Sequence, residues 1–184
     1  LIAADDPVTY YVNDGSTLHD AWSTAVGRDD NDGLSPATPK ASVQSVLSTY
    51  DLGPGDVVRI DTGQYVLEDD IRVTELDAGD SSAPVTFEAS PYGVTMDRGW
   101  LYSSYVWKIT GNHVALRTAS SAKYPELGQR WMELKGANTG VQVEASHVAL
   151  QRLDVNANYK FGICVNGLEH DEVLIEHNVI RNVI

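Results

Sequence analysis

The sequence predicts an all-β protein, a solenoid of the parallel β-helix type in which short strands stack turn upon turn. After about residue 55, short runs of Val, Ile and Leu alternate with Gly, Asn, Asp and Ser. The segment GNHVALR at 111–117 returns as ASHVALQ at 145–151 and, more loosely, as HDEVLIE at 170–176. Repeats of about 20 to 25 residues built from strands are typical of solenoids, and the parallel β-helix is the solenoid that lacks helices between its strands.

The repeats also predict a register between successive turns. They place Val114, Val148 and Val173 at one position of the turn, 34 and 25 residues apart. The first spacing exceeds the second by nine residues, which matches a polar loop inserted around 120–129. The strands that we predict are 57–60, 71–73, 85–87, 106–109, 114–116, 141–143, 148–150, 163–165 and 173–175.

One amphipathic helix is predicted over residues 40–50. Val43, Val46, Leu47 and Tyr50 recur at the spacing of one helix face. The first turn of a solenoid exposes an apolar end, and repeat arrays require a cap at that end. We therefore expect the helix to cover the N-terminal end of the stack.

Two other folds with many short strands fit the sequence less well. A β-sandwich needs hairpin turns every 8 to 12 residues, and the one strong hairpin dipeptide within the repeats is Asn166-Gly167. A leucine-rich repeat needs the pattern LxxLxLxxN, which the chain does not contain. The parallel β-helix is therefore favoured.

Composition excludes several classes of function. The 13 Lys and Arg residues against 26 Asp and Glu residues give a net charge of −13, which argues against nucleic-acid binding because phosphate contacts need clustered cations. No apolar run approaches the ~20 residues of a membrane span, so we expect none. The single cysteine, Cys164, excludes an intramolecular disulfide and a CxxC metal site.

Three segments resemble the N-terminal region of right-handed parallel β-helix proteins. They are VGRDDNDGLSPATPKASVQSVL at 26–47, LGPGDVVRIDTGQY at 52–65 and APVTFEASPYGVTMDRG at 83–99. The pattern is an NDGxSPxxP segment, a capping helix, PGD before the first strand, GxY after it and APVT entering the next turn. It occurs in polysaccharide lyases acting on pectate, alginate or chondroitin, and in β-helix repeats of very large bacterial surface proteins. The resemblance covers about residues 10–110 and implies a right-handed β-helix that is extracellular or on a bacterial cell surface.

We therefore divide the chain into two parts. Residues 1–56 form an N-terminal segment with an acidic loop and the capping helix, and residues 57–184 form about five turns that we expect to continue beyond the chain end. Residues 179–184 still follow the strand and turn pattern, and no capping helix comes after them. We expect this open end to pair with another copy or with a further domain.

The acidic loop is the candidate metal site. Asp29, Asp30, Asn31 and Asp32 precede Gly33, and closely spaced oxygen ligands on a loop suit Ca²⁺. The spacing does not fit an EF-hand. The alternative is a turn rich in Asp and Asn that binds no metal. We expect no organic cofactor.

Two histidines occupy one position of two turns, which places their rings about 5 Å apart or, if an inserted turn lies between them, about twice as far. His113 and His147 lie one repeat apart, and a pair of stacked imidazoles can hold a transition metal. No third ligand lies near them in the sequence. The reading that we favour is a pair of surface turn residues.

Two kinds of polysaccharide-cleaving enzyme would each require different catalytic residues. A lyase that removes the proton α to a uronate carboxylate needs a base, and Lys160, beside Tyr159 and ahead of a strand, is the candidate. The alternative is an ordinary solvated lysine. A glycosidase needs two facing carboxylates, and Asp154 and Glu176 lie in adjacent turns.

The inserted loop carries the candidate substrate-binding residues. Trp131, Tyr124 and Arg130 would form an aromatic and basic rim for a glycan. The alternative is that Trp131 only covers the edge of a turn. We expect a carbohydrate-directed or surface/adhesion module that is a fragment of a larger protein, with a polysaccharide lyase acting by β-elimination on an acidic polysaccharide as the alternative.

Overall fold

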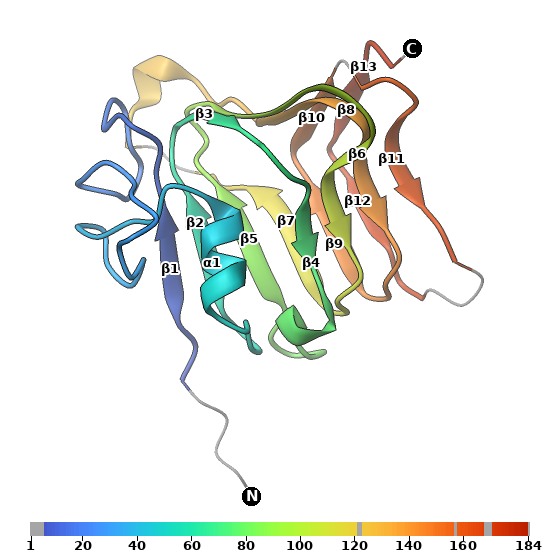
Figure 1. The fold of residues 1–184 in the computed structure, drawn as a ribbon, viewed down its shortest axis with the longest axis horizontal. Helices are drawn as coiled ribbons and strands as arrows, with labels where there is room; N and C mark the ends of the chain where they lie inside the picture. Colours follow the sequence, from blue (N-terminus) through green and yellow to red (C-terminus); the bar gives the residue numbers. More distant parts are fainter. Residues whose placement is uncertain (1–5, 121–122, 157, 168–170, 184) are drawn as a thin grey trace, which may run out of the picture.

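The computed structural model describes residues 6–120, 123–156, 158–167 and 171–183. It consists mainly of β-strands in two sheets, with one α-helix and two short 3₁₀ turns (Figure 1). All strand pairings within the described residues are parallel. A β-sandwich of hairpins is therefore excluded for this part of the chain.

The first sheet has the strand order β1-β2-β5-β7-β9-β12, so each strand pairs with the corresponding strand of the next repeat. Val114 lies opposite Val148, as the repeats predict. Leu174 lies opposite Ala149, which continues the same register to Val173. The strands are β1 (Thr9–Val12), β2 (Val57–Ile60), β5 (Val85–Ala89), β7 (Val114–Thr118), β9 (Val148–Gln151) and β12 (Leu174–Glu176).

The second sheet has the order β13-β10-β8-β6-β3, and in addition β4 pairs with β6 and β11 pairs with β8. Two of its strands, β6 and β8, are long enough to pair with one strand along their first half and with another along their second half. The strands are β3 (Gly63–Val66), β4 (Ile71–Val73), β6 (Val94–Ile109), β8 (Met132–Val143), β10 (Leu153–Asn156), β11 (Phe161–Val165) and β13 (Val179–Arg181).

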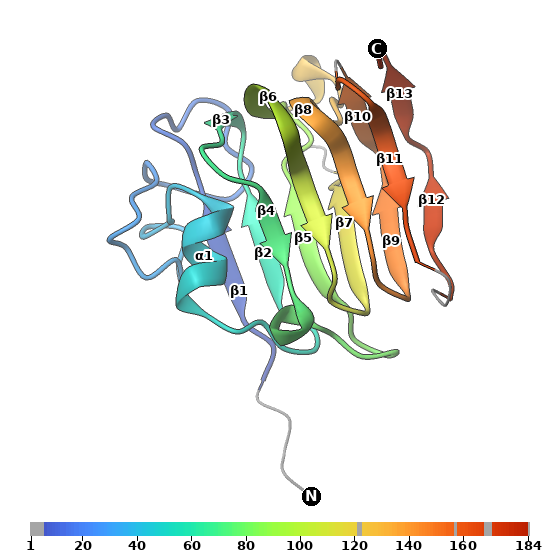
Figure 2. The same ribbon diagram turned by 45° about the vertical axis from the view of Figure 1, so that its right-hand side comes forward.

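The long strands β6 and β8 divide the second sheet into two strips. Their pairing register shifts between Asp97 and Tyr105 of β6. The first halves of β6 and β8 pair with β3 and β10, and together with β13 these strands form strip 1. The second halves of β6 and β8 pair with β4 and β11, and these strands form strip 2. Figure 2 shows the strands of strip 2 side by side. The chain thus visits the first sheet, strip 1 and strip 2 in turn, which is compatible with a solenoid-like fold.

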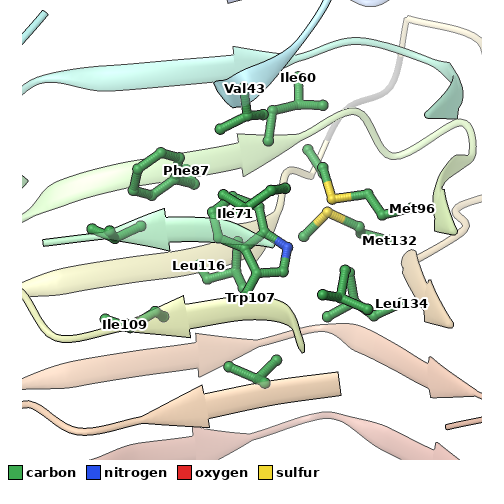
Figure 3. Close-up of a cluster of buried hydrophobic side chains, with 14 of the residues drawn as sticks. Val43, Ile60, Ile71, Phe87, Met96, Trp107, Ile109, Leu116, Met132 and Leu134 are labelled. Carbon is green, nitrogen blue, oxygen red and sulfur yellow. The ribbon is translucent and has the colours of Figure 1, made fainter. Parts of the chain in front are cut away.

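The core fills the space between the first sheet and the two strips (Figure 3). Alternate side chains point inward in strands such as β2, where Val58 and Ile60 are buried. Phe87 of the first sheet meets Trp107 of strip 2 edge to face, with 5.1 Å between ring centroids. Burying these apolar side chains is the main favourable contribution to folding. Other fully buried members are Ile71, Met96, Ile109, Leu116, Met132, Leu134, Leu150 and Leu153.

The predicted helix is present as α1 (Val43–Thr49). The Ser42 side chain caps it by accepting a hydrogen bond from the Ser45 amide at 3.1 Å. Val43 and Val46 are buried in the core, and the helix contacts β1 and β4 (Figure 2). It therefore continues the layer of strip 2 at the N-terminal end of the stack. No helix among the described residues is long and apolar enough to cross a membrane.

Several strands were not predicted. Strand β1 lies inside the N-terminal segment 1–56 and pairs with β2, so the first sheet begins one strand earlier than predicted. Strands β3 and β10 and the first halves of β6 and β8, which together make most of strip 1, were also missed. The inserted loop is where the spacing predicts it, because the segment joining β7 to β8 is longer than the other connections between the first sheet and strip 1.

Candidate functional site

A groove with a volume of about 610 Å³ runs over the outer face of strip 1. Its floor is made of outward side chains of successive strands, among them Gln64, Thr95, Glu133 and Asp154. One wall is the N-terminal loop after β1, and another is the end of the inserted loop. The groove therefore lies between two loops that are not part of the stacked strands.

Charged side chains form a network on the floor. Thr95, Glu133 and Asp154 are register neighbours on β6, β8 and β10. Arg181 of β13 makes two hydrogen bonds to Asp154, at 2.9 and 2.6 Å, and its guanidinium lies 3.7 Å from Glu133. These hydrogen bonds raise the pKa of Arg181. Glu133 also accepts a hydrogen bond from the Asn156 amide at 2.7 Å.

The inserted loop is attached to the N-terminal loop at one end of the groove. The Lys123 ammonium donates a hydrogen bond to the backbone oxygen of Asp20 at 2.6 Å. The Tyr124 ring packs against Tyr92 and His19, with centroids 5.0 and 5.9 Å away. Two segments that are about 100 residues apart in sequence thus form one continuous wall.

The N-terminal loop is held by a buried carboxylate. Asp61, which follows β2, accepts hydrogen bonds from the backbone amides of Ala21, Trp22 and Ser23 at 2.6 to 2.9 Å. It accepts a further one from Thr62. A carboxylate that accepts several backbone amides fixes the path of a loop that has no regular structure of its own. The position of this wall is therefore set by a residue of the stack.

Asp20 lies next to this anchor and is itself buried. One of its oxygens accepts a hydrogen bond from the Asn13 amide at 2.7 Å, and the other has no partner among the described residues. Burial and the nearby charge of Asp61 raise the pKa of Asp20 to about 7, although Asn13 opposes the shift. The wall of the groove thus contains a carboxyl group that changes its charge near neutral pH.

The three predicted rim residues lie together at this end of the groove. Arg130 and Trp131 line it. Tyr124 stands behind them, and its backbone amide donates to the Tyr92 hydroxyl at 2.9 Å. None of the ion pairs formed by the described residues involves Arg130, whose side chain is exposed. Arg130 therefore offers a cation to a ligand.

Each of the four side chains in the acidic loop forms hydrogen bonds within this region. Asp29 accepts from the Ala41 amide, Asp30 pairs with Arg28, Asn31 donates to the Pro39 carbonyl, and Asp32 accepts from the Leu34 amide and the Thr38 hydroxyl. The four side chains thus have separate partners. Within the described residues no group of three or more His, Cys, Asp or Glu side chains is arranged to hold a metal ion. Calcium binding by this loop stays a prediction.

The histidines stack directly, at the shorter of the two expected spacings. The rings of His113 and His147 are parallel within 2°, with centroids 4.3 Å apart. Both residues have positive φ, as does Glu172 at the same place in the next turn. Glu172 lies 3.0 Å from His147 Nδ1. Ring nitrogens of two stacked imidazoles point in parallel directions, so this geometry fits turn residues better than a pair of metal ligands.

The candidate catalytic residues do not lie together. Lys160 is exposed on the turn before β11, outside the groove, with its ammonium 5.1 Å from the Phe161 ring centroid. Glu176 ends β12 in the first sheet and accepts from the Gln151 amide, whereas Asp154 lies on strip 1. The carboxylate next to Asp154 is Glu133, which was not a candidate because β10 and the first half of β8 were not predicted.

Comparisons of the chain with protein-family models, with curated proteins and with solved structures found no match. The resemblance of the N-terminal segments to β-helix proteins therefore stays an interpretation of the sequence. Function is inferred from the groove and its chemistry.

Proposed function

We propose that the chain is a saccharide-binding module of a right-handed parallel β-helix protein, secreted or on a bacterial cell surface. The groove on strip 1 is the observation that supports this proposal. Its volume of about 610 Å³ suits a ligand several sugar units long, since ligand sites commonly measure roughly 300 to 1,000 Å³. Right-handedness is supported by the rule that crossovers between parallel strands of one sheet are almost always right-handed.

The groove offers the chemistry that a saccharide requires. Trp131 presents an indole for the apolar face of a sugar ring. The carboxylates of Glu133 and Asp154 can accept hydrogen bonds from hydroxyl groups. Arg130, with no described ion-pair partner, can bind a uronate carboxylate through two parallel hydrogen bonds. We therefore favour an acidic saccharide.

Binding is favoured over catalysis by the state of these groups. Arg181 holds Asp154 in an ion pair and lies 3.7 Å from Glu133, and such ion-pair networks often have a structural role. Lys160, the candidate base for elimination, lies outside the groove. The arrangement suits a surface that holds a polymer without cleaving it.

Titration calorimetry with hexasaccharides prepared from pectate, alginate and chondroitin tests the proposal. We expect at least one to bind, and Arg130→Ala to weaken it by about tenfold or more, in the range for a charged hydrogen bond. Arg28→Ala is the matched control, because Arg28 is an exposed arginine that already pairs with Asp30 outside the groove. No binding by any of the three, or equal loss in both variants, contradicts the proposal.

A polysaccharide lyase is the second candidate, and the cationic Lys160 beside an aromatic surface is what favours it. In the elimination a base removes the proton α to the uronate carboxylate, the bond from C4 to the glycosidic oxygen breaks, and that oxygen takes a proton. A double bond forms in the new end unit. Ultraviolet absorbance of that unsaturated uronate, lost in Lys160→Ala, would support the lyase. Its absence with all three polymers would contradict it.

A further inference from the structure

A cluster of exposed aromatic side chains lies at the corner where strip 1 meets strip 2. We call Trp100, Tyr102, Tyr159 and Phe161 the aromatic ledge. Trp100 is 53% exposed and Tyr102 71% exposed, and the other two are also exposed. These residues do not line the groove described above. Large aromatic side chains are usually buried, so a group of them at one corner calls for an explanation.

The ledge forms across a turn that has Gly136, the buried Ala137 and the half-buried Asn138 at the same corner. Trp100 and Tyr102 belong to β6, and Tyr159 precedes β11, two turns further on. The turn between them has Gly136 and Ala137 there, and the Tyr159 amide donates to the Ala137 carbonyl. The rings of Tyr102 and Tyr159 therefore meet over this turn, edge to face, with centroids 4.7 Å apart.

The backbone under the ledge is strained. Trp100 has φ of 64° and the preceding Gly99 has 68°. Positive φ is rare for a bulky residue, and such strain concentrates at functional sites. Gly136 makes room for it, because a Cβ at that position would lie 3.2 Å from the Trp100 nitrogen and 2.4 Å from Asp97 Oδ1. Trp100 thus combines an unfavourable backbone conformation with an exposed indole ring.

The segment that carries Trp100 and Tyr102 is anchored at both ends. Buried Arg98 donates to the Leu67 carbonyl at 2.6 Å and lies 3.4 Å from Asp70. The amide of Tyr105, at the other end, donates to the same Asp70 oxygen at 3.0 Å. A rigid base reduces the ordering cost of binding, which favours a preformed ligand surface.

We propose that the ledge is a second saccharide subsite, in which the apolar C–H faces of pyranose rings pack on the exposed aromatic rings. The proposal deepens the saccharide-binding function and rests on it for the identity of the ligand. Lys135 and Asp97, 3.5 Å apart, lie between groove and ledge on the outer face of strip 1. Three residues separate Glu133 from Ala137 on β8, a step of at most about 13 Å at the usual rise, because the strand turns at Gly136, which has positive φ. One oligosaccharide therefore reaches both subsites.

A nucleic-acid ligand is disfavoured, although bases also stack on aromatic rings. Such sites combine stacking with a positively charged groove, and this chain has a net charge of −13. Lys160 adjoins the ledge, with its ammonium over Phe161, and Lys135 lies toward the groove in an ion pair with Asp97. So few cations beside several rings suit the sparse charge of a uronate-containing saccharide.

Two variants of the ledge test the proposal in the same calorimetric titration. We expect Tyr102→Ala and Trp100→Gly each to weaken hexasaccharide binding by about fivefold or more. Leu76→Ala is the control, because Leu76 is an equally exposed apolar residue on the 3₁₀ turn Glu75–Asp77, away from the ledge, and should bind as the wild type does. Unchanged affinity in both ledge variants overturns the subsite.

Trp100→Gly also separates a binding role from a structural one. Glycine adopts positive φ without strain, so we expect Trp100→Gly to raise the melting temperature by about 2–4 °C while binding weakens. A lower melting temperature would mean that Trp100 supports the fold and would contradict the proposal.

The pattern of losses distinguishes the two proposals. If Arg130→Ala weakens binding and the ledge variants do not, the groove stands and the ledge fails. The reverse pattern leaves the ledge as the binding site and contradicts the groove. If Tyr102→Ala abolishes self-association measured by light scattering and leaves saccharide binding intact, the ledge is a protein contact and the proposal fails.

Discussion

The carboxyl group of Asp20 couples the wall of the groove to pH. Its pKa is about 7 in the folded chain and 3.8 when unperturbed, because burial and Asp61 disfavour the charged form. The folded state therefore holds the proton more tightly than the unfolded state. Stability that this group contributes below about pH 4 is lost as the pH rises to about 7, and no further change follows above that value.

Asp20→Asn should remove this loss, because the amide keeps an oxygen for Asn13 and carries no charge. We expect the variant to melt higher than the wild type at pH 8, by about 2–6 °C. The difference should shrink as the pH falls to 4. Thermal unfolding of both proteins across this range checks it, and a difference that is independent of pH would contradict the assignment.

The acidic loop gives a second prediction for single residues. If Asp29, Asn31 and Asp32 bind Ca²⁺, a chelator lowers the melting temperature of the wild type, and Asp32→Ala removes that sensitivity. Asp80→Ala is the matched control, because Asp80 also accepts backbone and hydroxyl hydrogen bonds in a turn, from Ser82. It should keep the sensitivity. A melting curve that chelator leaves unchanged would identify the loop as an ordinary turn.

At the scale of elements, strand β8 bends at Gly136, which has positive φ and lies beside the register shift between β6 and β8. An alanine there meets both positive φ and the close approach of Asp97. We expect Gly136→Ala to lower the free energy of unfolding by at least about 2 kcal/mol. Gly53→Ala, where a Cβ meets no atom within 4 Å, should change it by about 0.5 kcal/mol or less. Chemical denaturation of both variants measures the difference, and similar midpoints would show that the bend relaxes easily.

The sequence predicts the first sheet much better than strip 1. Strands β7 and β9 of the first sheet share the apolar run VAL, so the repeats in the sequence identify them. Strands of strip 1 alternate buried and outward polar residues over only four positions, as LDVN of β10 does. Their pattern is too short to distinguish from a turn. The helix was predicted because it has a clear apolar face.

The candidate site was predicted only where it lies on an insertion. Arg130 and Trp131 are identified by the nine extra residues between two repeats. Glu133, Asp154 and Arg181 converge because three strands stack in register. That register is a property of the folded chain, and residues that are 21 or 27 positions apart in the sequence carry no local signal of it. The aromatic ledge was missed for the same reason, since Tyr102 and Tyr159 meet across two turns.

For the whole molecule, the last turn exposes apolar side chains on an open face. Ile175 and Ile180 pair with Leu150 and Val155, which are fully buried one turn earlier. Both isoleucines are exposed. The strands β12 and β13 also have backbone groups without a neighbouring strand among the described residues. Such edges and apolar surfaces favour association.

We expect the chain to self-associate in solution in a concentration-dependent way. Ile180→Lys should shift it toward the monomer, because a charge on this face opposes contact. Val66→Lys, which places the same charge on an exposed position of β3, should not. Light scattering after size exclusion measures the mass. A wild-type monomer at all concentrations would contradict the prediction.

The central claim is that strip 1 binds a saccharide, and nuclear magnetic resonance tests it most directly. An isotope-labelled chain is titrated with the hexasaccharides of pectate, alginate and chondroitin, and the backbone amide shifts are followed. The account predicts that the changes produced by a binding saccharide cluster at Thr95, Arg130, Trp131 and Glu133 and extend to Tyr102. Shifts confined to the first sheet, or none with any of the three at millimolar concentration, would contradict it.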